Sequence, residues 1–219
     1  TLLDYWIESI SGTTPNQLAT VWIEFDSIGT NATTFYMYYG KTDAAAYSNG
    51  INTFPFFDDF PGESLDGDKW TTENVTVGVG SSIITLTESA ATSGWLKGKS
   101  DFGVNYRTRF KAKTAHHTQG SVAQEVIGLR IESPVEMNAA QFSHSMNMNY
   151  RNYTASGSDY GTITGWVADT WGIFNINRGA SAAIYTINDA NAVTLSNYYS
   201  VANMHPYVYV QKSTVNAVV

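Results

Sequence analysis

Hydrophobic and polar residues alternate with a period of two along most of the chain, which is the pattern of half-buried β-strands. In a clear early example, Val21, Ile23 and Phe25 fall on one side of an expected strand. Similar runs recur at the intervals typical of an antiparallel sandwich, and Gly, Asn, Ser and Asp fill the gaps between them. The strands expected after residue 70 are 74–78, 82–88, 94–99, 104–113, 125–132, 140–144, 145–150, 162–167, 170–177, 182–187 and 207–211. The pattern therefore predicts an all-β protein.

The first fifty residues predict a separate and smaller β unit. Residues 1–10 and 19–25 are strand-like, and residues 33–40 are rich in β-branched and aromatic side chains. An Ala run that ends at Gly50 predicts one short helix over residues 41–49.

An aromatic and acidic segment, residues 54–70, follows this unit. It reads Phe-Pro-Phe-Phe-Asp-Asp-Phe-Pro-Gly-Glu-Ser-Leu-Asp-Gly-Asp-Lys-Trp, so it combines rings that favour burial with carboxylates that favour water, a cation or backbone donors. We interpret it as the first strand of a second domain. The expected organisation is a small N-terminal β domain over residues 1–53 and a β-sandwich over residues 54–219.

The charge balance limits the classes of partner. The net charge of −7 argues against nucleic acid or an anionic membrane surface, both of which require a cationic face. The longest apolar runs are too short to span a bilayer, so no membrane insertion is expected. Cations concentrate in one stretch, where Arg107, Arg109, Lys111 and Lys113 alternate with other residues. That alternation predicts a solvated outer strand face, or a partner for the acidic segment.

Three sequons for N-glycosylation occur in Thr-rich, turn-like surroundings, at Asn31, Asn74 and Asn152. A chain rich in Ser and Thr collects some sequons by chance. Taken as acceptors, they predict an extracellular or cell-surface location.

Particular motifs resemble known families. The stretches LLDYWIES, ATVWIEFDSI, FYMYYG and FFDDF, within residues 1–60, resemble a domain of unknown function found in secreted and surface proteins of archaea and bacteria. FFDDFPGESLDGDKW and SGWLKGKSDFGVNYRTRFKAKT resemble the opening of a concanavalin A-like (laminin G-like) lectin or glucanase β-sandwich. That resemblance implies a jelly roll of two antiparallel sheets, in some members a structural calcium, and frequently carbohydrate binding or adhesion.

Both ends of the chain depart from these patterns. Residue 1 already lies some strands into the first domain, and the sequence up to Val219 lacks the closing strand with Asp and Trp that the second fold usually carries. Open sheet edges are therefore expected at the termini. Either the chain is a fragment, or a neighbouring subunit completes the sheets by strand addition.

Carboxylate pairs were considered first as candidate chemistry, because glucanases of this class use two carboxylates on one strand face. Glu24 and Asp26 share a face but lie in the wrong domain, and Pro134 separates Glu132 from Glu136. We therefore expect no catalysis by these residues.

Calcium is a second use for the acidic residues. Hard oxygen ligands for a structural calcium are available from Asp58, Asp59, Asp66 and Asp68. The alternative is that Asp66-Gly-Asp makes a turn and that Asp59 caps backbone donors.

Aromatic side chains offer a further binding chemistry, because sugar rings stack on flat aromatic faces and hydrogen-bond to amides. The candidate glycan-binding residues surround the Asn- and Met-rich segment: Tyr150, Arg151, Asn152, Tyr153, Tyr160 and Trp166. The alternative is that these side chains fill the sandwich core or a face between subunits.

These patterns support three hypotheses of function. The first is a non-catalytic extracellular recognition or adhesion module that binds glycans or a surface partner. The second is a self-assembling subunit of a surface layer or filament, and the third is a glycan-cleaving hydrolase. No nucleophile motif or phosphate-binding loop favours another enzyme class.

Overall fold

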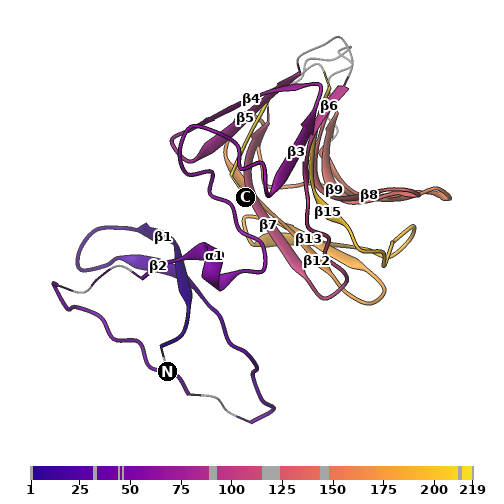
Figure 1. Cartoon of the computed structure of the whole chain (residues 1–219). Helices are drawn as coiled ribbons and strands as arrows, with labels where there is room; N and C mark the ends of the chain where they lie inside the picture. Colours follow the sequence, from indigo (N-terminus) through magenta and orange to yellow (C-terminus); the bar gives the residue numbers. More distant parts are fainter. Residues whose placement is uncertain are drawn as a thin grey trace. The chain divides into compact units, whose positions relative to one another are not determined.

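The computed structural model describes residues 2–31, 34–43, 45, 47–88, 93–114, 124–143, 148–211 and 214–218. The chain divides into two compact units, Thr1–Asp58 and Asp59–Val219 (Figure 1). No helix in the described part is long and apolar enough to cross a membrane.

The first unit is built on a two-stranded antiparallel sheet of β1 (Tyr5–Ser11) and β2 (Leu18–Ile23). One short helix, α1 (Gly50–Thr53), begins after Asn49, whose side chain accepts a hydrogen bond from the Asn52 backbone N–H at 3.1 Å. Rings of Trp6, Trp22, Phe54 and Phe57 pack edge-on or stacked, with Trp6 and Phe57 centroids 4.9 Å apart. This aromatic cluster joins β1 and β2 to the segment around α1.

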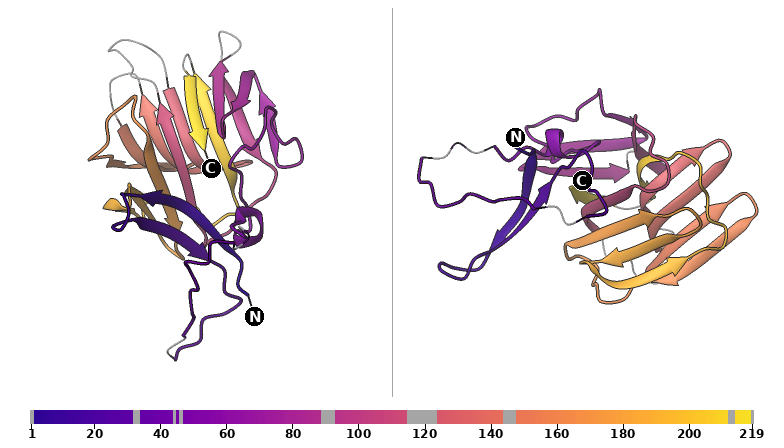
Figure 2. Two further views of the ribbon diagram at one scale, coloured as in Figure 1. Left: turned by 90° about the vertical axis from the view of Figure 1, so that its left-hand side faces the viewer. Right: turned by 90° about the horizontal axis from the view of Figure 1, so that it is seen from below.

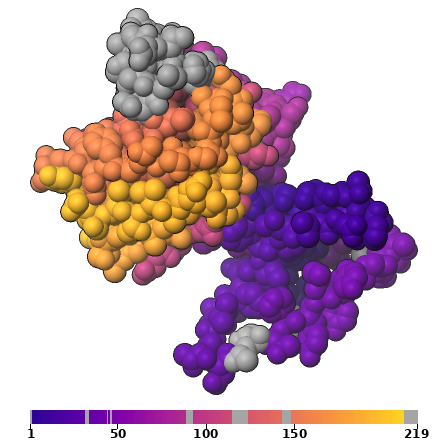
Figure 3. All heavy atoms as spheres, turned by 180° about the vertical axis from the view of Figure 1, so that it is seen from behind, coloured from indigo at the N-terminus to yellow at the C-terminus, as the bar shows by residue number. Residues whose placement is uncertain are grey.

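Two expectations for the first unit are wrong. Residues 34–40 form no strand, and Tyr36 and Tyr38 are 78% and 93% exposed. A strand also needs a neighbouring segment to pair with, which β propensity alone does not provide. The one short helix starts at Gly50, after the residues 41–49 that were expected to form it, of which 44 and 46 lie outside the described residues. Space-filling atoms show gaps between chain segments of this unit (violet in Figure 3).

The acidic segment 54–69 is also not a strand. Pro55 and Pro61 interrupt strand hydrogen bonding, and Phe60 and Gly62 have φ values of 50° and 98°, which a strand cannot contain. The first strand of the second unit is instead β3, which starts at Trp70.

The described part of the second unit contains two seven-stranded sheets in which all neighbours are antiparallel (Figure 2). The first sheet has the order β11 (Gly157–Thr162), β10 (Met148–Thr154), β9 (Val135–Ser143), β8 (Gln124–Glu132), β15 (His205–Gln211), β6 (Ser93–Gly98) and β3 (Trp70–Glu73). The second has the order β14 (Ala190–Leu195), β13 (Ala183–Ile187), β12 (Gly172–Arg178), β7 (Arg107–Thr114), β16 (Thr214–Val218), β5 (Ile83–Glu88) and β4 (Val75–Gly80).

Alternate residues of the two sheets meet in one core. Tyr150 from the first sheet stacks on Tyr185 from the second at 4.9 Å, and Phe142 meets Phe174 edge-on at 5.5 Å. This architecture confirms the predicted all-β jelly-roll sandwich. Most of the expected strands are present, but residues 163–167 form a loop.

The C-terminal strand does not leave an open edge. β16 lies between β5 and β7, where Val215 pairs with both Leu86 and Thr114, and β15 lies between β8 and β6. The expectation of an open edge at the C-terminal end is therefore wrong, because the jelly roll inserts late strands between early ones. Addition of a neighbouring subunit's strand stays a prediction. At the other end, β1 pairs with β2, and its Tyr5 carbonyl also accepts a hydrogen bond from the Asn49 backbone N–H at 2.8 Å.

Candidate functional site

The outer face of the first sheet gathers aromatic, cationic and amide side chains. Within its strands, alternate residues face the core, and the remaining positions point outward. We call the following outward set the aromatic-cationic face: Trp95, Lys97, Arg130, Met137, Gln141, Arg151, Tyr153, Tyr160, Tyr207 and Tyr209.

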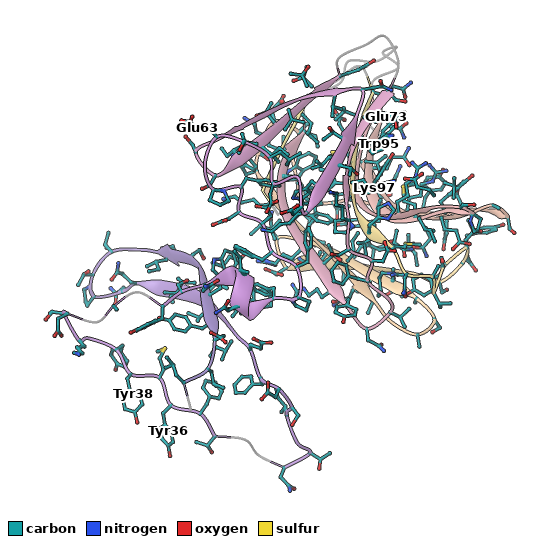
Figure 4. All side chains as sticks on the ribbon, in the orientation of Figure 1. Tyr36, Tyr38, Glu63, Glu73, Trp95 and Lys97 are labelled. Atoms are coloured by element: carbon teal, nitrogen blue, oxygen red, sulfur yellow. The ribbon has the colours of Figure 1, made fainter. Side chains whose placement is uncertain are left out.

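This sheet is curved, and the aromatic-cationic face is on its concave side. Strands β8 and β9 bend along their length (Figure 1). Trp95 and Lys97 lie on the same side of β6, toward the inside of that bend (Figure 4).

Strand register aligns the face into a row. Six outward residues occupy opposite positions on six neighbouring strands: Tyr160, Arg151, Ala139, Gly128, Tyr207 and Lys97. The row spans roughly 24 Å, from five strand spacings of ~4.8 Å each. Its middle positions, Gly128 and Ala139, carry the smallest side chains, and both flanks carry long or aromatic ones. Ala139, Gly128 and Tyr207 are buried, so the exposed part of the row lies at its ends, at Tyr160 and Arg151 on one side and Lys97 on the other.

Arg151 organises one flank of this row. Its guanidinium lies 4.7 Å from the Tyr153 ring centroid and 5.3 Å from that of Tyr160. It donates hydrogen bonds to Gln141 Oε1 at 3.0 Å and to Ser158 Oγ at 2.9 Å. These contacts hold the planar guanidinium in one orientation, and Tyr160 remains 52% exposed beside it.

Arg130 and Lys97 organise the other flank. The Arg130 guanidinium lies 4.7 Å from the Tyr207 ring centroid and donates from Nη1 to the Tyr207 hydroxyl at 2.9 Å. Lys97 Nζ lies 4.9 Å from the Trp95 ring centroid. Burial raises the pKa of the Tyr207 phenol, so its hydroxyl remains protonated at neutral pH.

The centre of the face is apolar. Val126, Met137 and Ala139 are buried and in contact, and Tyr153 and Tyr209 pack against them. The Tyr153 and Tyr209 rings are the partly exposed apolar surface here, and such rings beside hydrogen-bonding groups suit a ligand that has both CH faces and hydroxyl groups.

His205 lies at one end of β15 between two carboxylates. Its Nδ1 is 3.2 Å from Asp101 Oδ1, and its Nε2 is 3.7 Å from Glu132 Oε1. Burial lowers the pKa of the imidazole, although the Asp101 carboxylate acts in the opposite direction. The neutral ring is therefore favoured at pH 7.

Three of the six predicted glycan-binding residues come together on this face: Arg151, Tyr153 and Tyr160. The other three are in the core, where a ligand does not reach them. Tyr150 is fully buried against Tyr185, and burial raises its pKa. Trp166 is 6% exposed, packs against Phe142 and donates from Nε1 to the Thr170 carbonyl at 3.1 Å.

Asn152 is the third core residue. Its Oδ1 accepts from Asn138 Nδ2 at 2.8 Å and from the Tyr185 hydroxyl at 2.6 Å. Its Nδ2 donates to the carbonyls of Leu195 and Asn197 at 3.0 and 3.2 Å. With 0% exposure and four such bonds, Asn152 is neither a ligand contact nor an accessible glycan acceptor in the folded chain. Asn31 and Asn74 are exposed, and Asn74 lies in the turn between β3 and β4.

Sequence reasoning missed seven of the ten residues of the face. The missed residues are Trp95, Lys97, Arg130, Met137, Gln141, Tyr207 and Tyr209. The alternation Trp95-x-Lys97 and Tyr207-x-Tyr209-x-Gln211 carried the signal, because each pair falls on one side of its strand.

The four aspartates proposed for calcium do not form a metal site in the described residues, where no group of three or more acidic or histidine side chains converges. Asp66 Oδ1 accepts from the Asp68 backbone N–H at 2.9 Å, which is the turn considered as the alternative. Two lysines contact this segment: Lys69 Nζ is 3.8 Å from Asp66 Oδ2, and Lys99 Nζ donates to the Gly67 carbonyl. The residues present therefore do not fit a calcium ion.

A family model matches the first third of the chain, which includes the first unit and β3 of the second. Residues 1–73 match the model of a family described as a domain of unknown function, DUF2341. A search for curated relatives gave no match.

Solved structures resemble the sandwich at low identity. A β-1,3-glucanase from Mycobacterium marinum is 11% identical, with a TM-score of 0.60, over 75% of this chain and 96% of that one. A β-glucanase from Bacillus licheniformis is 9% identical, with a TM-score of 0.59, over 74% and 94%. A protein from Mycobacterium tuberculosis described as a pseudo β-1,3-glucanase is 11% identical, with a TM-score of 0.60, over 74% and 95%. At this identity the likeness establishes the fold.

Proposed function

We propose that this chain is a non-catalytic, extracellular recognition module that binds a glycan on the aromatic-cationic face. The observation that carries the proposal is the Arg151 guanidinium held beside the half-exposed Tyr160 ring, in one row with Lys97, which lies beside Trp95 on the same face of the sheet. A sugar chain lying along this row would stack on the exposed Tyr160 ring and meet fixed guanidinium and amide donors.

The positions of the carboxylates favour binding over cleavage. Two described strand carboxylates, Glu73 and Glu132, have outward positions on this sheet. Glu73 is three strands away from β8, in the row of Val126, and Glu132 is six residues further along β8 than Val126. They are therefore separated by on the order of 20 Å, whereas glycoside hydrolysis uses two carboxyl groups about 5–10 Å apart.

One closer pair, Asp101 and Glu132, keeps hydrolysis as the second candidate function. The His205 imidazole lies between these carboxylates and contacts both. A glycosidic oxygen would need the volume that the ring occupies, so this arrangement suits a fixed ion-pair network at the end of β15.

Both the solved relatives and the exposed sequon at Asn74 are compatible with this proposal. Two of the relatives are named as glucanases and one as a pseudo β-1,3-glucanase, which makes β-1,3-glucans suitable first probes. An exposed acceptor asparagine fits an extracellular location.

The test is binding of laminarihexaose, a β-1,3-linked hexasaccharide, by calorimetry with a parallel assay for new reducing ends. We expect saturable binding without cleavage, and we expect Tyr160→Ala and Trp95→Ala to weaken it by roughly tenfold or more each. Tyr36→Ala, in the first unit, is the matched control and should leave affinity unchanged. Absence of binding to this and to the other glycans of an array would refute the proposal. Cleavage abolished by Glu132→Gln or Asp101→Asn would establish the hydrolase instead.

A further inference from the structure

A second feature lies on the outer face of the other sheet, away from the aromatic-cationic face. A hollow of about 610 Å³ is lined by Gly78, Gly80, Ser81, Thr85, Lys113 and Trp171, among others. The hollow is open to solvent on one side, so a ligand would lie against its lining. None of these residues belongs to the site described above.

Strand register explains why the surface is hollow here. Gly78 pairs with Thr85 across β4 and β5, and Asn216 of β16 pairs with both Thr85 and Lys113. Lys113 is thus two strands, or roughly 10 Å, from Thr85. A side chain at Gly80 would meet no atom within 4 Å, so the glycine end of the hollow is open space beside bare backbone.

Lys113 and Trp171 line the opposite wall of the hollow, and Lys111 lies beside them, two residues before Lys113 on the same face of β7. Lys111 Nζ lies 5.7 Å and Lys113 Nζ 5.9 Å from the ring centroid of Trp171. Trp171 is partly buried, and it precedes β12 directly beside the Gly172–Ala112 pair. Both ammonium groups are therefore held near one indole ring.

These two lysines differ from the other cations of the same strand. Arg107 and Arg109 both donate to Asp189 Oδ1 at 2.7 Å, so one carboxylate serves them both. Within the described residues, Lys111 and Lys113 have no carboxylate partner. In a chain of net charge −7, two uncompensated ammonium groups at a hollow form a local site for an anion.

We propose that this hollow binds an acidic saccharide, a sugar chain that carries carboxylate or sulfate groups. The Trp171 ring offers a stacking surface for the CH face of a pyranose, and Lys111 and Lys113 pair with its anionic substituents. Ser81 and Thr85 supply hydroxyl groups for the sugar hydroxyls, and the glycines let the ring approach the backbone. The inference does not depend on the function proposed for the first sheet.

Three tetrasaccharides test it by calorimetry at low salt: tetragalacturonate, sulfated maltotetraose and neutral maltotetraose. We expect at least one of the two acidic probes to bind and neutral maltotetraose not to bind. Binding of only one acidic probe identifies the anionic group, and both results support the proposal. The affinity should fall steeply with added salt.

Variants locate the site. Lys111→Gln and Lys113→Gln should each weaken acidic-probe binding by roughly tenfold, because each removes a charge-assisted contact. Trp171→Ala should weaken it comparably. Lys41→Gln, the same charge change in the first unit, and Tyr160→Ala, on the aromatic-cationic face, should leave it unchanged. If Trp171→Ala fails to fold, the two lysine variants still decide the matter.

Three results would overturn the proposal. Neither acidic probe binds, or the neutral tetrasaccharide binds equally well, or the lysine variants bind the acidic probe as tightly as the wild type does. Failure of laminarihexaose binding affects only the site on the first sheet, so the two proposals fail separately.

Discussion

Replacing Asn152 with alanine should destabilise the second unit strongly, because this side chain connects its two sheets. Asn152 lies on β10 of the first sheet, and its Oδ1 accepts from the Tyr185 hydroxyl on β13 of the second. Its Nδ2 reaches the carbonyl of Leu195 on β14. The change removes four hydrogen bonds and leaves their partners in place.

The size of the effect follows from what those partners retain. The Tyr185 hydroxyl keeps a second bond, to the Arg151 carbonyl at 3.2 Å. Asn138 Nδ2 and the Leu195 carbonyl lose a partner in the buried interior. With about 1–3 kcal/mol for each buried group left unsatisfied, the free energy of unfolding should fall by about 3–5 kcal/mol. For a unit of this size, that corresponds to a decrease in Tm of roughly 6–20 °C.

Thermal and urea unfolding monitored by near-ultraviolet circular dichroism measures the effect. Asn149→Ala is the matched control, because Asn149 is on the same strand but points outward, and it should change stability by about 1 kcal/mol or less. If Asn152→Ala costs no more than the control, Asn152 is not a structural connection and the assignment of β10 faces is wrong.

Three further predictions concern buried and paired charges. Arg178 is buried and donates to the carbonyls of Phe102, Gly103, Ser200 and Ala202, so Arg178→Met should cost about 3–5 kcal/mol in urea unfolding, and a cost below 1 kcal/mol would contradict this role. The Arg109 hydrogen bond lowers the pKa of Asp189 in the folded state below its usual value of 3.8. The stability that ionised Asp189 adds is therefore complete above pH 3.8, and it is lost as pH falls through the pKa of the folded state. Because Asp189 is half exposed, the difference in stability between wild type and Asp189→Asn should be about 1 kcal/mol or less at pH 6 and should shrink progressively as pH falls below 3.8; a constant difference would contradict the pairing. Burial lowers the pKa of His205 below 6.5, so the folded state should lose stability as pH falls below that value, and an imidazole NMR titration midpoint above 6.5 would refute it.

The sequence predicted most of the sandwich because its signal is local. Residues 82–88 were expected to form a strand, and β5 spans Ile83–Glu88, where period-two alternation and flanking turn residues agree. Residues 33–40 have equally strong β propensity, but their described part, residues 34–40, is not paired in a sheet. Propensity describes a residue, whereas pairing depends on chain segments that are distant in sequence.

The candidate site was predicted only in part, for a geometric reason. Tyr150, Arg151, Asn152 and Tyr153 are consecutive, so successive side chains point to opposite faces of β10. Arg151 and Tyr153 point outward, and Tyr150 and Asn152 point into the core. The sequence shows that the side chains alternate, but it does not show which of the two alternating sets faces the second sheet. The contributions of β6, β8 and β15 depend on strand order, which brings together residues more than 100 positions apart.

The central claim is that the concave side of the first sheet binds a glycan and does not cleave it. Its most direct test is a titration of the protein with laminarihexaose, observed by two-dimensional NMR, with product analysis of the same sample after prolonged incubation. The account predicts shifts confined to residues of the aromatic-cationic face and an intact hexasaccharide. Shifts confined to other residues, or shortened oligosaccharides produced by the wild-type protein, would contradict it.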